Sequence, residues 1–394
     1  MALKYLDQID VKGKRVFVRA DFNVPLDDSG SITNDNRIRE TVPTLAYILD
    51  KGGAVIVASH LGRPKGKPDP RQSLAPVAKR LGELLGLQVQ FADDCISDAA
   101  IVKGRAVKPG EVLMLENLRF YAEEEKNSED FARKLGAAAD VYINDAFACS
   151  HRAHASVEAI TRVVPVCAAG FLMKKEIVNF ERAMHNPERP LLAIIGGAKV
   201  SGKLELLENI LQKVDCLVIG GGMAFTFLKA RGLEVGKSLV EADLIDTART
   251  VMAKAREKGV NLLLPTDCVI AEEMKQGVTT KTVSVNDIPA GWMGLDIGPE
   301  TIQAFNKVIG QAKTIVWNGP MGVFEMEGFE KGTFAIADSI GNSRAMSVVG
   351  GGDSVSALKK SGNQAKVTFV STAGGAFMEL LEGKILPGIK ALDK

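Results

Sequence analysis

Short apolar runs alternate with amphipathic stretches along the whole chain. In residues 73–86 apolar side chains recur every three or four positions, the period of one helix face, and residues 203–213 repeat this pattern. The runs between such stretches are apolar at successive positions, as expected for parallel strands that helices cover on both faces. The alternation predicts an α/β fold with mainly parallel sheets. The expected strands are residues 16–18, 54–58, 112–115, 141–143, 191–195, 217–219, 262–264, 314–317, 346–349 and 367–370.

The length of 394 residues favours two domains over a single core. Residues 172–184 predict a helix, and the segment 185–190 that follows contains two prolines. A new strand then begins at Leu191. We therefore expect an N-terminal Rossmann-like lobe over residues 1–170, a linker helix and hinge over 171–190, and a second Rossmann-like lobe over 191–378.

The charge balance argues against a nucleic-acid or membrane partner. Lys and Arg number 49 and Asp and Glu 48, and neither half of the chain is polybasic. The N-terminus has no apolar core of a signal peptide, and no stretch is long enough to span a bilayer. The five cysteines are scattered without CxxC spacing, which suits reduced thiols. The sequence therefore predicts a cytoplasmic protein.

A glycine- and lysine-rich turn, GGAKVSGK, follows the expected strand 191–195 and precedes a helix. Glycines let the backbone approach a phosphate, the helix N-terminus offers free N–H groups, and Lys199 and Lys203 add charge. The turn nearly matches a P-loop, but Leu204 stands where a hydroxyl would hold Mg²⁺. At this point a tight strand–helix turn with solvent-exposed lysines remains the alternative.

Two further strands end in glycine-rich turns, GGGDS at 350–354 and STAGG at 371–375. Neither is the GxGxxG pattern of a dinucleotide site. Asp353 could be a helix N-cap or could hold a metal ion that bridges phosphates. The glycines 220–222, after another strand, could let a flat base lie against the backbone. Together these turns indicate a nucleotide with Mg²⁺.

The first half offers a different chemistry, because polar and cationic residues there follow several expected strands. Forked guanidiniums beside carboxylate and carboxamide groups suit a small, multiply anionic substrate. The alternative is a set of surface arginines in ion pairs. Cys149, His151 and His154 match no standard zinc spacing, so anion contact or hydrogen bonding is the preferred role for His60 and His151. The residues of this candidate anion site are Asp21, Asn23, Arg37, His60, Arg63, Arg119 and Arg152.

These motifs, taken together and in this order, resemble the phosphoglycerate kinase family over nearly the whole chain. The order and number of the motifs make the resemblance specific. The motifs are RADFNVP (19–25), SHLGRP (59–64), LENLRF (115–120), NDAFACSHRAHAS (144–156), GGAKVSGK (196–203), GGGMAFTFL (220–228), LPTD (264–267), DIGPET (296–301), WNGPMGVFE (317–325), GGGDS (350–354) and ELLEGKILPG (379–388).

The resemblance implies a glycolytic, monomeric kinase that bends at a hinge. Its reaction would be reversible phosphoryl transfer, 1,3-bisphospho-D-glycerate + ADP = 3-phospho-D-glycerate + ATP, with Mg²⁺ as cofactor. The N-terminal lobe would bind 3-phosphoglycerate through the anion-site residues, the lobe 191–378 would bind the nucleotide, and residues 379–394 would return to the first lobe. Arg37, Lys199 and Gly375 would be catalytic. The nucleotide would meet Lys203, Gly221, Gly222, Gly294, Glu325, Gly351, Gly352, Asp353 and Ser354, and Asp353 would also hold the metal.

The chain departs from the family pattern at three places. Gly202 stands where an aspartate is common, Ala373 replaces a glycine, and Ala148 with Cys149 replaces commoner small residues. No general base is expected, because the acceptor oxygen is already ionised; positioning and charge neutralisation are what the transfer needs. The alternatives are another small-molecule kinase or P-loop-like NTPase, which rests on GGAKVSGK alone, and a non-catalytic nucleotide-binding scaffold.

Overall fold

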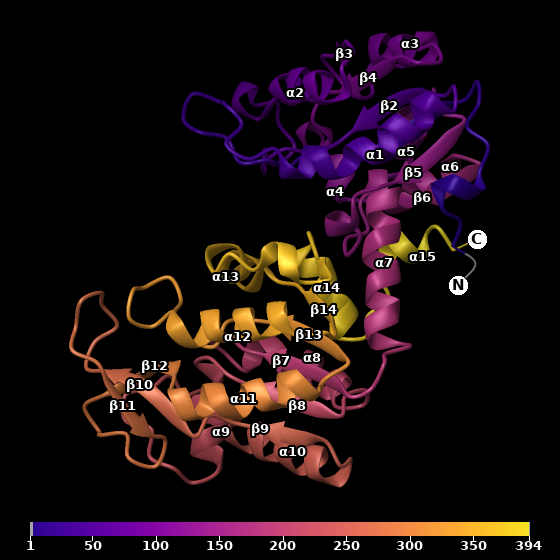
Figure 1. The fold of residues 1–394 in the computed structure, drawn as a ribbon. Helices are drawn as coiled ribbons and strands as arrows, with labels where there is room; N and C mark the ends of the chain where they lie inside the picture. Colours follow the sequence, from indigo (N-terminus) through magenta and orange to yellow (C-terminus); the bar gives the residue numbers. More distant parts are fainter. Residues whose placement is uncertain (1–2, 394) are drawn as a thin grey trace. The chain divides into compact units, whose positions relative to one another are not determined.

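The computed structural model describes residues 3–393 and divides them into two compact units (Figure 1). The first unit comprises the described residues up to Ile177 together with those from Ile385 onward. The second unit is Val178–Lys384. Each unit is built around its own six-stranded parallel sheet. The α/β fold with mainly parallel sheets is thus confirmed, and each of the ten expected runs overlaps a strand.

The first sheet has the strand order β3-β4-β2-β1-β5-β6. Val16 in the central strand β1 pairs with Val55 on one side and Val141 on the other, and the interior strands are buried on both faces. This explains why they are apolar at successive positions. The strands are β1 (Arg15–Arg19), β2 (Ala54–Ala58), β3 (Val89–Ala92), β4 (Val112–Leu115), β5 (Val141–Asn144) and β6 (Val166–Ala169).

Helices cover both faces of this sheet. Val16 and Val18 of β1 belong to one buried cluster with Ile38 and Leu45 of α1. On the opposite face Ile56 of β2 lies against Gly104 of α3. The helices of this unit are α1 (Asn36–Asp50), α2 (Ala75–Leu85), α3 (Asp98–Ala106), α4 (Ala122–Glu125), α5 (Glu129–Gly136), α6 (Ile160–Val163) and α15 (Pro387–Lys390), with 3₁₀ turns at Leu6–Gln8, Pro70–Gln72, Leu118–Phe120 and Phe147–Cys149 and a π-helical turn at Ala155–Ala159.

The second sheet has the order β15-β14-β13-β7-β8-β9, which is the 3-2-1-4-5-6 order of doubly wound folds. Leu191, Ala193 and Ile195 of β7 enter one core, and Leu192 and Ile194 enter the core on the other face. The strands are β7 (Leu191–Ile195), β8 (Cys216–Ile219), β9 (Asn261–Leu263), β13 (Thr314–Asn318), β14 (Met346–Val349) and β15 (Phe369–Val370).

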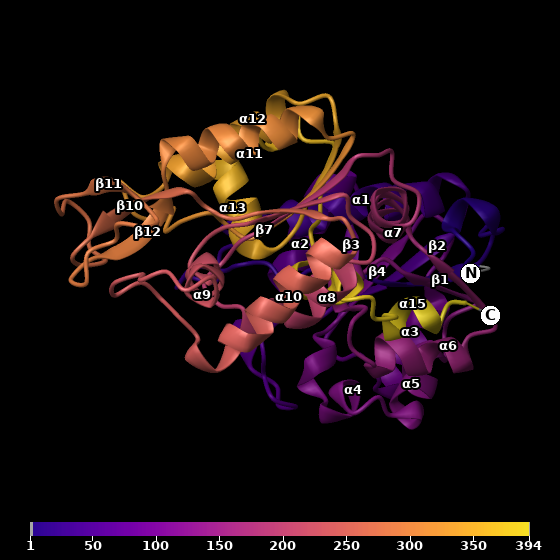
Figure 2. The same ribbon diagram turned by 90° about the horizontal axis from the view of Figure 1, so that it is seen from below.

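A small antiparallel sheet, β11-β10-β12, is added to this unit. Its strands are β10 (Asp267–Ala271), β11 (Lys281–Ser284) and β12 (Met293–Ile297). The packed helices α11 and α12 lie side by side (Figure 2). The helices of the unit are α8 (Leu204–Ile210), α9 (Met223–Ala230), α10 (Ile245–Glu257), α11 (Pro299–Gln311), α12 (Lys331–Asn342), α13 (Gly352–Lys360) and α14 (Gly374–Leu381), with 3₁₀ turns at Ser201–Lys203, Ala242–Leu244 and Gln364–Lys366.

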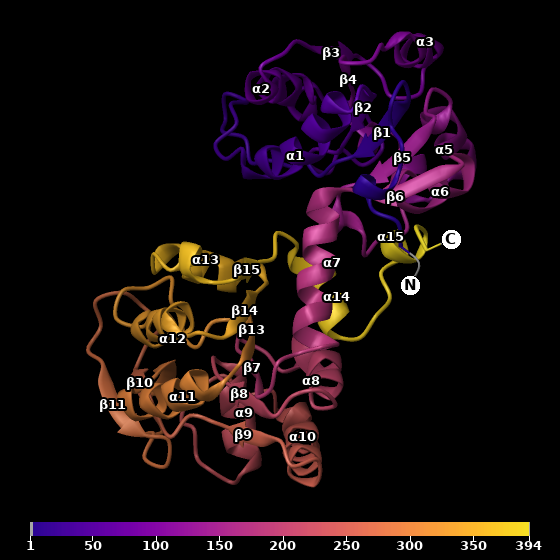
Figure 3. The same cartoon turned by 45° about the vertical axis from the view of Figure 1, so that its right-hand side comes forward.

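The boundary between the units falls within α7 (Phe171–Met184), which is one continuous helix (Figure 3). The helix expected over residues 172–184 is confirmed. Its first residue, Phe171, packs edge-on against Tyr47 of the first unit with ring centroids 5.0 Å apart. Near the end of the helix, Phe180 packs edge-on against Phe377 of the second unit with ring centroids 6.2 Å apart. At the other end of the chain, Gly388 N–H donates to Ser150 O (2.9 Å), which ties the segment after Ile385 to the first unit.

Candidate active site

The two sheets each have one point where the chain reverses the direction in which it adds strands. In the first unit the chain moves from β1 to β2 on one side and from β5 to β6 on the other, so the reversal lies between β1 and β5. In the second unit it lies between β7 and β13. Ligands of open α/β sheets bind beyond the carboxyl ends of strands at such points. Asp21 and Asn23 follow β1 and Arg152 follows β5, while the glycine- and lysine-rich turn follows β7.

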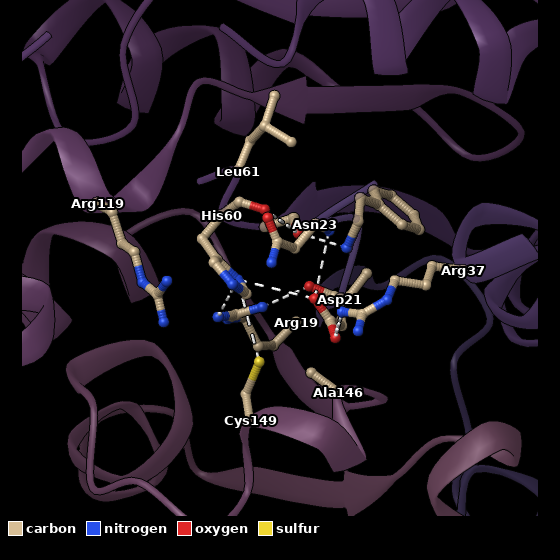
Figure 4. A network of polar contacts seen from close by, with 12 residues as sticks. Arg19, Asp21, Asn23, Arg37, His60, Leu61, Arg119, Ala146 and Cys149 are labelled. Carbon is tan, nitrogen blue, oxygen red and sulfur yellow. Dashed lines mark hydrogen bonds and ion pairs between the residues drawn. The ribbon is translucent and has the colours of Figure 1, made fainter. Parts of the chain in front are cut away.

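Asp21 is the centre of a polar network beyond β1 (Figure 4). Its carboxylate, 5% exposed, pairs with the guanidinium of Arg37 from the first turn of α1. Its Oδ1 lies 3.9 Å from Nδ1 of His60, a residue that comes shortly after β2. The structure therefore gathers three expected site residues from three separate segments.

The backbone of Gly62 joins two more of the expected residues. Its N–H donates to Asn23 Oδ1 (2.8 Å), and its carbonyl accepts from Arg119 Nη1 (3.0 Å). Arg119 is 6% exposed, so its guanidinium is largely shielded from water. Arg63 is the next residue after Gly62 and is exposed. Arg152 is also exposed and donates to His151 Nε2 (3.1 Å).

Arg19, on β1, is a member of this network that sequence reasoning missed. Its side chain is fully buried and donates from Nε to Ser156 Oγ (2.8 Å). Its Nη2 lies 3.3 Å from His60 Nδ1. Because a guanidinium can only donate, this contact assigns the ring proton of His60 to Nε2. An arginine within an otherwise apolar strand run was the available signal.

Burial, together with the charges of nearby arginines, keeps His60 and His154 neutral. Burial and the charges of Arg19 and Arg119 hold the pKa of His60 well below its usual value. Burial and Arg19 likewise lower the pKa of His154 to about 3. In the same region burial, and then the charge of Asp21, raise the pKa of the Cys149 thiol to about 11. The positive charge of the site thus comes from guanidiniums, and the cysteine is a neutral thiol.

Asp21, His60 and Cys149 place one potential metal-ligand atom each within 4.8 Å of one another. Among the described residues this cluster joins Cys149 to His60, which lies 89 positions away, and not to His151 or His154. The donor types would suit zinc. However, the lone pair of His60 Nδ1 already accepts a hydrogen bond from Arg19, and the carboxylate of Asp21 is already paired with Arg37. A guanidinium-lined site favours a small polyanion over a dication.

In the second unit the turns after β7 and β13 approach each other through glycines. Gly196 N–H donates to Asn318 O (2.9 Å), and a Cβ on Gly196 would lie 2.1 Å from Pro320 O. Only glycine permits this approach. The turns border a cavity of about 460 Å³ whose lining is mostly apolar. Five expected nucleotide residues line it, namely Gly221, Gly222, Gly294, Glu325 and Asp353.

A cationic and helix-terminal region lies in the same unit. Lys203 Nζ donates to Asn318 Oδ1, and Asn318 Nδ2 donates to Gly350 O (2.9 Å). Burial lowers the pKa of Lys203 to about 8, although the charge of Asp353 opposes the shift. A Cβ on Gly374 would lie 3.8 Å from Gly352 N, so the starts of α13 and α14 are close together. Two helix N-termini and a lysine therefore lie close together, an arrangement that favours a phosphate group.

The remaining expected residues differ in exposure. Lys199 and Gly375 are exposed, Gly375 in the first turn of α14. Asp353 is exposed in the first turn of α13, whose N-cap is Gly351 with φ +96°, so Asp353 is not the N-cap. Gly352 is the first residue of that helix. Ser354 is fully buried, and its Oγ accepts from Gly319 N (2.6 Å), which links the two turns.

Two of the departures from the family pattern fit their surroundings. Ala373 is buried at the N-cap of α14 with φ −117° and ψ 98°, an extended conformation that any residue adopts. The Cβ of Ala373 therefore places no restriction on the backbone of this turn. Gly202 faces open space, since nothing lies within 4 Å of a Cβ built there.

Comparisons with known proteins identify the family of this chain. The sequence matches the family model of phosphoglycerate kinase over residues 6–384. The chain belongs to the phosphoglycerate kinase family. A phosphoglycerate kinase of Geobacter metallireducens is 58% identical over 395 residues, covering 100% of this chain and 99% of that protein. One from Nostoc punctiforme is 53% identical over 395 residues, covering 100% and 98%. The structure of phosphoglycerate kinase from Coxiella burnetii superposes with a TM-score of 0.94 at 43% identity, covering 99% of this chain and 98% of that one.

The family establishes the reaction class. The enzyme is a glycolytic phosphotransferase with a carboxyl group as acceptor, and its reaction is the reversible transfer of a phosphoryl group between 1,3-bisphospho-D-glycerate and ADP. The match extends far beyond the GGAKVSGK turn, so a P-loop NTPase or another small-molecule kinase is not favoured.

Proposed function

We propose that the guanidinium network of the first unit binds 3-phosphoglycerate. Asp21, Asn23, Arg37, His60, Arg63, Arg119 and Arg152 would provide the contacts. The observation that supports this assignment is the convergence of five of these residues, from four separate segments, on Asp21 and Gly62. Guanidiniums would pair with phosphate and carboxylate oxygens, and Asp21 and Asn23 would accept from the substrate hydroxyl.

The nucleotide would occupy the second unit. The base would lie in the apolar cavity against Gly221, Gly222 and Gly294, and Glu325 would accept hydrogen bonds from the ribose. Lys203 and the N–H groups at the start of α13, including Gly351, Gly352 and Ser354, would meet the phosphates. These residues surround Asp353, which lines the cavity.

Mg²⁺ fits this donor set. Mg²⁺ in nucleotide sites is typically held by one or two carboxylates together with substrate phosphates. Asp353 offers such an exposed carboxylate beside the phosphate-binding helix N-terminus. When bound, the ion would neutralise charge on the phosphates. Asp353 itself would orient the phosphate tail toward Lys203.

The catalytic task of the protein is positioning and charge neutralisation. A carboxylate or ADP oxygen attacks without prior deprotonation, so no general base is required. Arg37, Lys199 and the N–H groups around Gly375 would neutralise the three equatorial oxygens of the moving phosphoryl group. His60, held neutral with its proton on Nε2, would donate a hydrogen bond and would not act as a base.

Transfer also requires the two substrates to meet. Each proposed site belongs to one unit, yet in-line transfer needs contact distance. We therefore assign a hinge-bending closure to the enzyme, with residues 171–190 as linker and hinge. Closure would also exclude water from the reactive acyl phosphate.

We assign the enzyme to the cytoplasm as a monomer. All five cysteines are buried and none of them forms a disulfide, which suits a reducing compartment. No helix among residues 3–393 combines the length and apolarity needed to cross a bilayer.

A coupled assay of ATP consumption that depends on 3-phosphoglycerate tests the whole proposal. We expect turnover only when 3-phosphoglycerate, ATP and Mg²⁺ are all present. Consumption of ATP at the same rate without 3-phosphoglycerate would contradict it. Calorimetric titration of each substrate alone would then test the assignment of one site to each unit.

A further inference from the structure

The turn that carries both lysines is held from outside by a carboxylate. We call residues Gly196–Lys203 the lysine loop. Glu241 Oε2 accepts from Val200 N (2.6 Å) and from Ser201 N (3.0 Å), and its Oε1 accepts from Ser201 Oγ (2.5 Å). A single side chain therefore satisfies two backbone donors and one hydroxyl between Lys199 and Lys203.

Glu241 lies at the end of a segment that is itself fixed to the unit. Its own N–H donates to Thr226 Oγ1 (3.1 Å), and Thr226 is buried in α9. Earlier in the segment, Ser238 Oγ accepts from Gly294 N (2.9 Å). Leu239 lines the cavity and is 45% exposed. The carboxylate thus has a rigid support, which a positioning group requires.

The charge of Glu241 favours this role over a direct contact with substrate. Burial would raise the pKa of Glu241, but the hydrogen bonds from Ser201 and Val200 and the charge of Lys199 lower it below its usual value. The group is therefore an anion at neutral pH. An anion would repel the phosphates, whereas an ionised acceptor forms stronger hydrogen bonds with N–H donors than a neutral one.

We propose that Glu241 is a positioning residue of the phosphoryl transfer, which fixes the lysine loop so that Lys199 is held at the migrating phosphoryl group. The proposal rests on the roles proposed above for Lys199 and Lys203. Lys199 has an exposed, flexible side chain, so the geometry of its ammonium group depends on the backbone that carries it. A small misplacement of a charge-neutralising group costs rate more than binding.

Steady-state kinetics of Glu241→Gln test this. The amide keeps the size of the side chain but loses the charge and one acceptor, so we expect kcat to fall roughly five- to tenfold. The KM values for the nucleotide and for 3-phosphoglycerate should stay within about twofold, because Lys203, the nucleotide-binding lysine of this loop, is also held by Asn318. Glu234→Gln is the matched control, an exposed carboxylate of the same connection that pairs with Lys229, and should leave both constants unchanged.

A double-mutant cycle with Ser201→Ala identifies the path of the effect. Ser201 is exposed, so this variant should fold even if Glu241→Gln does not. Alone it should lower kcat about two- to threefold, and combined with Glu241→Gln it should add little, because both act on one contact. Additive losses, an unchanged kcat in folded Glu241→Gln, or a change confined to KM would each overturn the inference.

Failure of the inference and failure of the proposed function can be told apart. If Lys199→Ala is impaired while Glu241→Gln is not, the lysine role stands and only the positioning role is wrong. If Lys199→Ala itself resembles the wild type, the proposed function of the loop fails with it.

Discussion

The two units use the same kind of parallel sheet and place their candidate site residues beyond the same kind of reversal point, but these residues differ in chemistry. The first unit surrounds its reversal point with charged side chains, including a guanidinium that is fully buried. The second surrounds it with glycine turns and helix N-termini, and its cavity is mostly apolar. A small polyanion needs several fixed charges, whereas a nucleotide needs an apolar slot and backbone donors.

This difference makes the first unit dependent on its internal charge balance. Arg19 and Glu124 are both fully buried, and their charged atoms lie 4.0 Å apart. Glu124 also accepts from Ser156 N (2.9 Å) and Ser156 Oγ (2.5 Å). Burial of this kind has no counterpart at Lys199 or Asp353, which are exposed.

The largest expected effect is therefore on stability. Glu124→Gln leaves Arg19 buried without its partner and should lower the free energy of unfolding of the first unit by about 3 kcal/mol. Both tryptophans lie in the second unit and all four tyrosines in the first. In urea, the change in the near-ultraviolet circular dichroism of the tyrosines should occur at a lower urea concentration in the variant than in the wild type. The change in tryptophan fluorescence should stay at the same urea concentration. Glu123→Gln, exposed on the same helix, is the control. A shared shift of both signals would show that the units unfold together.

The next effect concerns the two lysines. Lys199→Ala should lower kcat at least about tenfold with little change in nucleotide KM, since loss of a charge-assisted contact costs about 1.5–3 kcal/mol. Lys203→Ala should mainly weaken nucleotide binding by a similar factor. Steady-state kinetics separate the two, with the exposed Lys307→Ala on α11 as control. Near-wild-type constants for both variants would contradict the assignment.

A smaller effect distinguishes the ligands of the two units. Arg63→Ala and Arg152→Ala should each weaken 3-phosphoglycerate binding by about tenfold or less, because both arginines are exposed and partly solvated. ATP binding should be unchanged. Calorimetry of each ligand alone measures this, with Arg105→Ala on α3 as an exposed control. Loss of ATP affinity in the folded Arg152→Ala variant would contradict the assignment of one ligand to each unit.

The pH dependence of the nucleotide KM tests the role of Lys203. Its pKa is lowered to about 8 by burial, so the free enzyme loses this charge as pH rises through 8 and retains it below. Nucleotide KM should therefore rise several-fold above pH 8 in the wild type, and this rise should be absent from Lys203→Ala. An identical pH profile in the variant would mean that another group titrates.

The smallest expected signal is the closure. On the proposed assignment, MgADP or 3-phosphoglycerate alone would contact one unit and would have little differential affinity for a closed state, so small-angle scattering should change little. Both ligands together should reduce the radius of gyration. If one ligand alone compacts the particle as much as both, the proposed division of sites between units does not govern closure.

How much could be predicted depended on the kind of signal. The central strands could be predicted because strands that are buried on both faces have continuous apolar runs. Helix α7 could be predicted from the helical period of its apolar residues and from the proline-containing segment that follows it. The edge strand β3 was missed because the exposed Gln90 interrupts its apolar run. The edge strand β6 is apolar throughout, but it is short and half of it is alanine, which is depleted in strands. Among the antiparallel strands, β11 was missed because it is exposed or half-exposed throughout. β12 was missed because Gly294 and Asp296 interrupt its apolar run although the strand is mostly buried. β10 was missed as well.

The sequence by itself determined the parallel α/β architecture, the glycine turns and the residue types of both sites. These are local properties: apolar runs, turn residues and motifs that can be read in order. Only the tertiary structure decided that Cys149 meets His60, that Arg19 donates to that histidine, and that Glu241 holds the lysine loop. Each of these contacts joins residues 40 or more positions apart. Strand order and packing bring them together, and neither is encoded in the spacing along the chain.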